Sequence, residues 1–110
     1  MKKLVSLFSG CGGMDLGFEG DFQILRKSYN QNIHPNWNII DRDNFVLLPK
    51  TGFTTVLAND ILDSASRAWV PYFKKRTKGK FIHGSIIDFV KSGEVDKYKN
   101  QGIDVITGGF

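Results

Sequence analysis

The stretch LVSLFSGCGGMDLGFEG, residues 4–20, joins an apolar run to a glycine-rich loop and a helical segment. Residues 4–8 are apolar except for Ser6, which predicts a short buried strand. Three glycines lie within residues 9–13, and a helix is predicted to begin near residue 14 or 15. Such a loop turns free backbone N–H groups and the positive helix end toward a ligand, which suits a phosphate or a carboxylate. The stretch therefore predicts an anion-binding loop behind a strand, with a plain tight turn as the alternative.

The rest of the chain alternates between strand and helix patterns. Further strands are predicted at FTTVLAND (53–60), KFIHG (80–84) and GIDVITGG (102–109), and helices at residues 61–69 and 85–93. Pro71 predicts a kink or a break after the first of these helices. Residues 21–52 are polar and rich in Asn, and they predict an irregular surface insertion. Because parallel strands need crossover helices, this order predicts an α/β fold with a parallel sheet.

Two common nucleotide-binding motifs are absent from the loop. It reads GCGG at 10–13, with the next glycine at Gly17, and this differs from the G-x-G-x-x-G of dinucleotide folds. Gly17 is followed by Phe18 and Glu19, not by the Lys and Ser or Thr of a phosphate-binding loop. A nicotinamide enzyme is therefore a weaker hypothesis than another nucleotide-like ligand.

Composition sets broad limits on the function. The chain has 110 residues, a formal net charge of +4, a pI near 9.3 and one cysteine, Cys11. These values fit one small domain in a reducing compartment, and a cytoplasmic location is expected. No apolar stretch reaches the roughly 20 residues of a membrane span, so no membrane partner is expected. His34 and His83 have no partner at metal-ligand spacing, so no metal is assigned. The basic run at 74–80 is interpreted as a solvated connector in preference to a DNA contact.

The opening motif closely resembles that of the DNA (cytosine-5) methyltransferases, which bind S-adenosylmethionine. The later motifs follow in the family's order: VLANDI (56–61), HGSI (83–86) and DVITGGF (104–110). In the family, the last of these leads to a Pro-Cys pair with the catalytic thiol, and no such pair occurs in this sequence. No catalytic residue is therefore assigned in the chain, and the nucleophile is expected beyond Phe110.

The resemblance also implies a fold. Residues 1–110 would be the N-terminal part of a Rossmann-like methyltransferase domain. They would form the first half of its parallel sheet, in the strand order 3-2-1-4.

The resemblance assigns roles at the cofactor site. Backbone groups of residues 9–13 would meet the methionine end of the cofactor, and Phe8 would form the wall beside the adenosine. Asp60 would accept hydrogen bonds from the ribose, and Ile61 would lie against the adenine ring. The family usually has an Asp where this chain has Ser85. The predicted cofactor-binding residues are Phe8, Ser9, Gly10, Cys11, Gly12, Gly13, Asp60, Ile61, Ser85 and Ile86.

Four residues leave alternatives. Asp41 also ends an apolar run, but a helical pattern follows Asp60 and not Asp41, which favours Asp60. Asp15 either offsets the helix dipole or contacts the ligand. Cys11 has no obvious base nearby in the sequence and is interpreted as a small packing residue. Asp88 is an alternative to Ser85 for the adenine contact.

The function implied by the resemblance is methyl transfer to C5 of cytosine in DNA, within a restriction-modification system of bacterial type. Double-stranded DNA would be bound through the remainder of the protein. This chain alone is expected to be inactive, because the catalytic thiol is missing. The alternatives are a cofactor-binding subunit that works with a second polypeptide, and an inactive truncated product.

Overall fold

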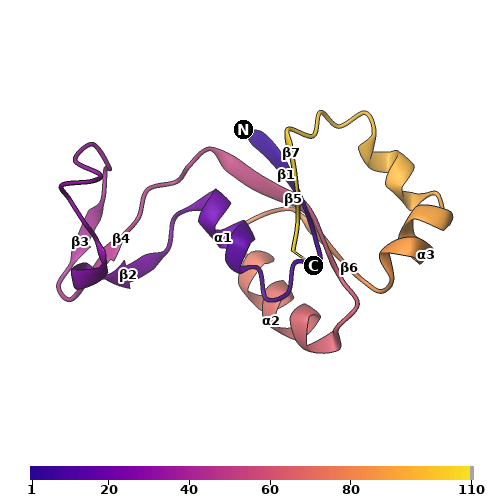
Figure 1. Ribbon diagram of the computed structural model, residues 1–110, viewed down its shortest axis with the longest axis horizontal. Coiled ribbons are helices and arrows are strands. Elements are labelled where there is room, and N and C mark those ends of the chain that lie inside the picture. Colours follow the sequence, from indigo (N-terminus) through magenta and orange to yellow (C-terminus); the bar gives the residue numbers. More distant parts are fainter. Residues whose placement is uncertain (110) are drawn as a thin grey trace.

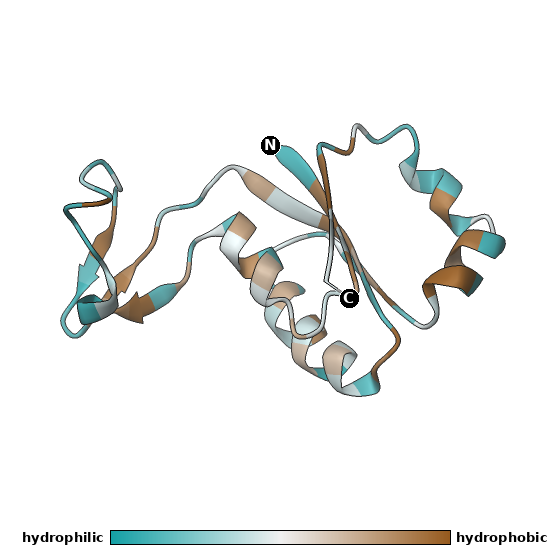
Figure 2. Ribbon diagram, in the orientation of Figure 1, coloured by the Kyte–Doolittle hydropathy of each residue, from teal (hydrophilic) through white to brown (hydrophobic). Residues whose placement is uncertain are grey.

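A four-stranded parallel sheet forms the centre of the molecule. The computed structural model describes residues 1–109. The sheet consists of β1 (Lys2–Leu7), β5 (Phe53–Asp60), β6 (Lys80–His83) and β7 (Val105–Gly108), in the order β6-β5-β1-β7. Of the two central strands, β5 is buried over most of its length and β1 over residues 4–6. Figure 2 shows β1 changing from hydrophilic at its start to hydrophobic toward the middle of the sheet. An α/β fold with a parallel sheet is therefore confirmed.

A second, antiparallel sheet occupies the segment that the sequence predicted to be irregular. It consists of β2 (Gln23–Leu25), β4 (Phe45–Leu47) and β3 (Ile40–Arg42), in the order β2-β4-β3. We call residues 23–47 the arm, and it stands apart from the main sheet in Figure 1. The prediction of an irregular segment was wrong because strands of three residues are too short to show a period of two. Val46, at the centre of this small sheet, is fully buried.

The three strands of the arm change the numbers that the strands of the main sheet carry. The prediction 3-2-1-4 assumed four strands, whereas residues 1–109 contain seven, and the order of the main sheet is β6-β5-β1-β7. The difference arises because the three strands of the arm lie between β1 and β5 along the chain. Counted among themselves, the four parallel strands follow as third, second, first and fourth.

Helices cover both faces of the main sheet. They are α1 (Gly13–Glu19), α2 (Asp63–Phe73) and α3 (Ile86–Lys91), with short 3₁₀ turns η1 (Arg26–Ser28) and η2 (Glu94–Tyr98). On one face, Trp69 and Phe73 of α2 pack with Ala58 of β5. On the other face, Phe89 of α3 packs with Val5 and Leu57. Right-handed crossovers explain why α1 and α2 lie on one face and α3 on the other. The chain passes from β1 to β5 and on to β6 in one direction across the sheet, through α1 and α2, and it returns from β6 to β7 through α3.

The helix α2 continues past Pro71 to Phe73, so the predicted break at the proline does not occur. Pro71 lies in the last turn of the helix, where its missing N–H removes one backbone hydrogen bond. The Lys74 N–H donates to the Val70 carbonyl at 3.0 Å, which closes the helix beyond the proline.

Candidate cofactor-binding site

The glycine loop and Asp60 meet at the carboxyl end of the parallel sheet. The Gly10 N–H donates to Oδ2 of Asp60 at 2.9 Å, although the two residues are 50 positions apart in the chain. The other carboxylate oxygen of Asp60, Oδ1, accepts from the Leu62 N–H at 2.9 Å. The Ser9 N–H donates to the Asn59 carbonyl at 2.9 Å, which holds the loop against the end of β5. The structure thus brings together two features that the sequence analysis had assigned to one site.

The glycines of the loop have different structural roles. A Cβ on Gly12 would lie 2.4 Å from a ring carbon of Phe73 and 2.8 Å from one of Trp69. Gly12 also has a φ of +93°, which other residues rarely adopt. Its missing side chain is therefore explained by packing on α2. A Cβ on Gly10 or Gly13 would meet no atom within 4 Å, so only these two border open space.

Asp15 lies beneath the loop and is fully buried, which favours its structural role over ligand contact. The Trp69 Nε1–H donates to Oδ2 of Asp15 at 2.7 Å, and this bond joins α1 to α2. Burial raises the pKa of the Asp15 carboxyl above its usual range, and the charge of Glu19 adds to this effect. Hydrogen bonding from the Ser6 and Trp69 side chains opposes the rise in pKa without cancelling it. The sequence analysis placed Asp15 in the first helical turn but did not detect that the side chain faces inward.

The apolar residues predicted at the cofactor site differ in their exposure and in their position relative to the loop. Ile61 is 65% exposed directly after β5, and Phe8 is 39% exposed directly after β1. Ile86 instead packs against the cluster of Val5, Leu57 and Phe89 under α3. The structure therefore places Phe8 and Ile61, but not Ile86, on the open edge beside the loop.

Ser85 begins α3, and its Oγ accepts from the Ile87 N–H at 3.2 Å. Ser85 is therefore an N-cap, which uses the acceptor side of its hydroxyl. The alternative residue, Asp88, is exposed in the first turn of the same helix.

The last motif of the sequence analysis, DVITGGF (104–110), falls mainly on β7. Residues 105–108 of the motif form this strand, which pairs in parallel with β1. Phe110 ends the motif and lies outside the described residues. The expectation that the nucleophile follows Phe110 therefore stays a prediction, and no catalytic residue is assigned among residues 1–109.

Asp41, the alternative to Asp60 for the ribose contact, lies away from the glycine loop. Asp41 is in β3 of the arm, where it is exposed and forms an ion pair with Arg26.

Cys11 is exposed, so the interpretation of this residue as a packing residue was wrong. His83 ends β6 as the sequence predicted, and His34 stacks on Trp37 in the arm with ring centroids 3.7 Å apart. Within residues 1–109, no group of three or more His, Cys, Asp or Glu side chains could hold a metal ion.

Asn59 contributes to the site's framework, and the sequence analysis overlooked it. Its side chain is 1% exposed, and Nδ2 donates to the carbonyls of Ile82 at 2.8 Å and Gly84 at 3.0 Å. These bonds fix the end of β6 beside the end of β5. A polar residue between the apolar run 56–58 and Asp60 was the available signal.

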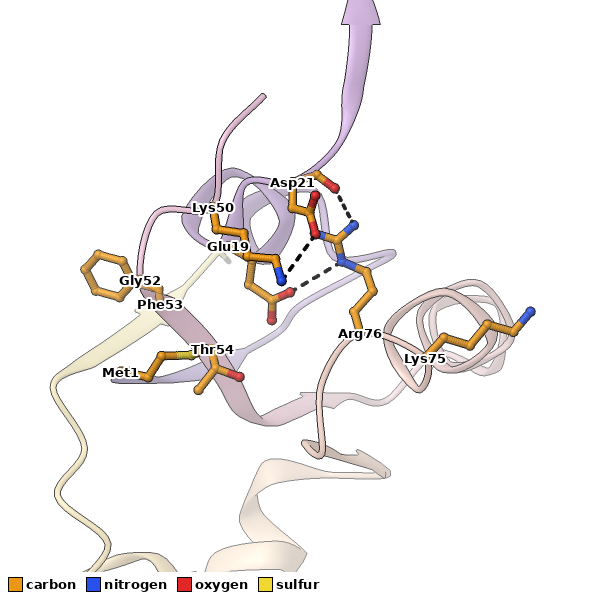
Figure 3. A pocket seen from close by; sticks show the side chains of 9 residues that line it. All are labelled: Met1, Glu19, Asp21, Lys50, Gly52, Phe53, Thr54, Lys75 and Arg76. Carbon is orange, nitrogen blue, oxygen red and sulfur yellow. Dashed lines mark hydrogen bonds and ion pairs between the residues drawn. The ribbon is translucent and has the colours of Figure 1, made fainter. Parts of the chain in front are cut away.

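A separate hollow of about 260 Å³ lies at the opposite, amino end of the sheet (Figure 3). Oε1 of Glu19 there accepts from the Thr55 N–H at 3.0 Å. Arg76 donates from its guanidinium to the carbonyls of Gly20 and of Asp21, the latter at 2.8 Å. Glu19 and Arg76 therefore join the last turn of α1 to β5 and to the end of α2.

Comparison with known proteins adds no identification: no family model, curated protein or solved structure matches the chain. Among residues 1–109, no helix has the length and apolar character needed to cross a membrane. The fold and the site define a class of structure, an α/β chain with a strand–glycine loop–helix unit beside an acidic strand end.

Proposed function

We propose that this chain binds S-adenosylmethionine and provides the cofactor half of a DNA (cytosine-5) methyltransferase. The observation that carries the proposal is the 2.9 Å hydrogen bond from the Gly10 N–H to the Asp60 carboxylate. It unites the loop of the first motif with the acidic end of the second at the carboxyl edge of a parallel sheet, where α/β folds bind nucleotides. The expected parent reaction is methyl transfer to C5 of cytosine in double-stranded DNA, in a cytoplasmic restriction-modification system.

The residues at this edge fit an adenosine-containing cofactor. Open space borders Gly10 and Gly13, so backbone can approach a ligand there. The Asp60 carboxylate accepts two N–H bonds, and a carboxylate has about four acceptor positions, so two positions are left for ribose hydroxyls. Phe8 and Ile61 supply exposed apolar surface for the adenosine. S-adenosylmethionine supplies an activated methyl group when bound; the chain's own residues bind and orient it.

A second candidate function is that of a cofactor-binding subunit of a split methyltransferase, and one specific observation favours it. β7 pairs only with β1, so its other edge is open within residues 1–109. Beside that edge lies a groove of about 370 Å³, lined largely by apolar residues, among them Val5, Leu7, Phe89 and Ile106. A helix and a parallel strand, from a second polypeptide or from an extension beyond Phe110, would cover both.

Calorimetric titration with S-adenosylmethionine tests the proposal. Ile61→Ala removes exposed apolar surface beside the loop, and we expect affinity to fall about fourfold to fifteenfold, the effect of losing one or two buried methylenes. Ile33→Ala in the arm is the matched control, because Ile33 is 67% exposed, and it should leave affinity unchanged. Asp60→Ala should weaken binding by about 1.5–3 kcal/mol, the range for a hydrogen bond to a charged group.

Asp60 also holds two backbone N–H groups, so its variant needs a folding control. The melting temperature and far-ultraviolet circular dichroism of each variant are measured beside the titration. Equal affinity of the wild type, Ile61→Ala and a folded Asp60→Ala would contradict the proposed site. No heat of binding with the folded wild type would contradict the proposed cofactor.

A further inference from the structure

The positive charge of the chain is concentrated at the amino end of the main sheet. We call the six cationic residues that line two adjoining hollows there the basic edge: Lys3, Lys50, Lys75, Arg76, Lys78 and Lys80. Lys2 and Lys74 adjoin this set in the sequence and bring it to eight of the chain's fifteen Lys and Arg residues. Four acidic residues lie beside it: Glu19, Asp21, Glu94 and Asp104. The seven cations and seven acids elsewhere cancel, so the excess of +4 belongs to this region.

The two hollows adjoin each other and share three lining residues. Their volumes are about 260 Å³ and 570 Å³, and both are bordered by Met1, Thr54 and Arg76. The smaller lies between the end of α1 and the end of α2, as Figure 3 shows. Both hollows lie along the starts of β1 and β5. A concave basic surface concentrates positive potential, because field lines from its walls converge in the groove.

The cations of the basic edge are only partly neutralised by acidic residues among residues 1–109, since three of the six form ion pairs. Lys75 and Lys78 are exposed and form no ion pair among residues 1–109. The pairs of Lys50 with Asp21 and of Lys80 with Glu94 are both long, at 3.9 Å. Arg76 is the exception, since its guanidinium is committed to backbone carbonyls and to Glu19. The free charge is thus carried by lysine ammonium groups on flexible stems.

We propose that the basic edge binds the phosphate backbone of nucleic acid, as a contact surface separate from the cofactor site. Exposed lysines act as mobile point charges, which suits phosphate contact without base reading. The surface lies at the strand starts, whereas the glycine loop and Asp60 lie at the strand ends. It therefore goes beyond the proposed function, because a duplex on the basic edge would not be the one presented at the cofactor end. Large apolar side chains also border the hollows, Phe53 the smaller one, Val56 and Tyr98 the larger one, and Met1 both.

The test is fluorescence anisotropy with a labelled, mixed-sequence DNA duplex, between about 50 and 200 mM salt. One variant combines Lys50→Gln, Lys75→Gln and Lys78→Gln. The control combines Lys27→Gln, Arg42→Gln and Lys91→Gln, three exposed residues outside the basic edge that form no ion pair within residues 1–109. Both variants lower the net charge equally, so the comparison separates local contact from overall charge.

We expect the basic-edge variant to bind at least tenfold more weakly than the wild type, with a salt dependence shallower by about 2–3 in slope. The control should stay within about threefold of the wild type and keep its slope. Equal losses in the two variants, or no binding of DNA by the folded wild type, would overturn the inference. Binding to phosphatidylserine vesicles that DNA does not displace would overturn it as well, in favour of a membrane surface.

The same variants separate this inference from the proposed function. Affinity for S-adenosylmethionine should be identical in the wild type and in the basic-edge variant, because the altered lysines lie at the other end of the sheet. Loss of DNA binding with unchanged cofactor binding supports two independent surfaces. A wild type that shows the expected DNA result but no cofactor binding would leave the basic edge standing and contradict the proposed function alone.

Discussion

Gly12 and Gly13 are neighbours in the loop, but their surroundings differ. Gly12 faces the rings of Phe73 and Trp69 and has a left-handed backbone, so its side of the loop belongs to the core. Gly13 begins α1, and a Cβ there would meet no atom within 4 Å. Only the second residue borders the space in which we place the cofactor. Substitutions at Gly12 therefore test packing on α2, and substitutions at Gly13 test ligand binding.

Gly12→Ala should destabilise the chain by about 2 kcal/mol or more, because a Cβ overlaps two rings and the backbone is left-handed. Gly13→Ala should leave stability unchanged or raise it by up to about 1 kcal/mol, since alanine favours helix. The same Gly13→Ala variant should bind S-adenosylmethionine more weakly. Urea denaturation and calorimetry measure the two quantities. A Gly13→Ala variant with normal affinity would mean that the space beside Gly13 is not used.

Asp15 gives the fold a pH dependence with a definite sign. Its pKa is raised from 3.8 by burial, so the folded state binds the proton more tightly than the unfolded chain does. Stability is therefore lost as the pH rises from 3.8 through the raised pKa. Asp15→Asn keeps an acceptor for the Trp69 N–H but does not titrate. We expect the variant to gain stability relative to the wild type as the pH rises, measured by urea denaturation at several pH values. A constant difference at all pH values would contradict a buried, titrating Asp15.

The arm is joined to the rest of the chain in a way that permits its removal. The Leu48 N–H donates to the Phe22 carbonyl at 3.0 Å, so the two strands leading into the arm are already paired at its base. Its largest side chains are half-exposed, Trp37 at 42% and Phe45 at 43%. Trp37 borders a hollow of about 360 Å³ near the end of α1 and does not fill it. The arm therefore adds little to the core of the main sheet.

Replacing residues 23–47 with Asn-Gly should give a folded chain, because the bond between Leu48 and Phe22 becomes that of a two-residue turn. We expect affinity for S-adenosylmethionine within about threefold of the wild type and a melting temperature within about 5 °C. Trp37→Ala in the full chain is the control for contacts of the arm alone. Loss of folding in the shortened chain would show that the arm supports the main sheet.

How much the sequence predicted depended on the range of the interactions involved. The parallel sheet and the position of Asp60 were predictable, because apolar runs and strand ends are local patterns. The fold of the arm was not, since three-residue strands owe their existence to pairing between distant segments. The burial of Asp15, the packing of Gly12 and the bonds of Asn59 also depend on contacts with α2 and β6. The concentration of charge at the basic edge required the topology, because its lysines come from three separate segments of the chain.

Taken as a whole, the chain should not methylate DNA, even though we expect it to bind the cofactor. Cytosine methylation at C5 requires an attacking thiolate, and the only cysteine, Cys11, is exposed within the glycine loop. Transfer of a radiolabelled methyl group to mixed-sequence DNA is expected to stay at background. If the proposed function is right, a second polypeptide or an extension beyond Phe110 that supplies the Pro-Cys motif should raise the transfer above background. Label incorporated by this chain alone would contradict the assignment, and Cys11→Ser would then show whether Cys11 is the nucleophile.

Nuclear magnetic resonance of the ¹⁵N-labelled chain during titration with S-adenosylmethionine tests the cofactor site most directly. The amide signals of residues 9–13 and of Ile61 should shift together and saturate at one affinity. Those of the arm and of the basic edge should not move, since both lie away from the carboxyl end of the sheet. Shifts centred on the arm or the basic edge, or no shifts at saturating cofactor, would contradict a cofactor site formed by the glycine loop and Asp60.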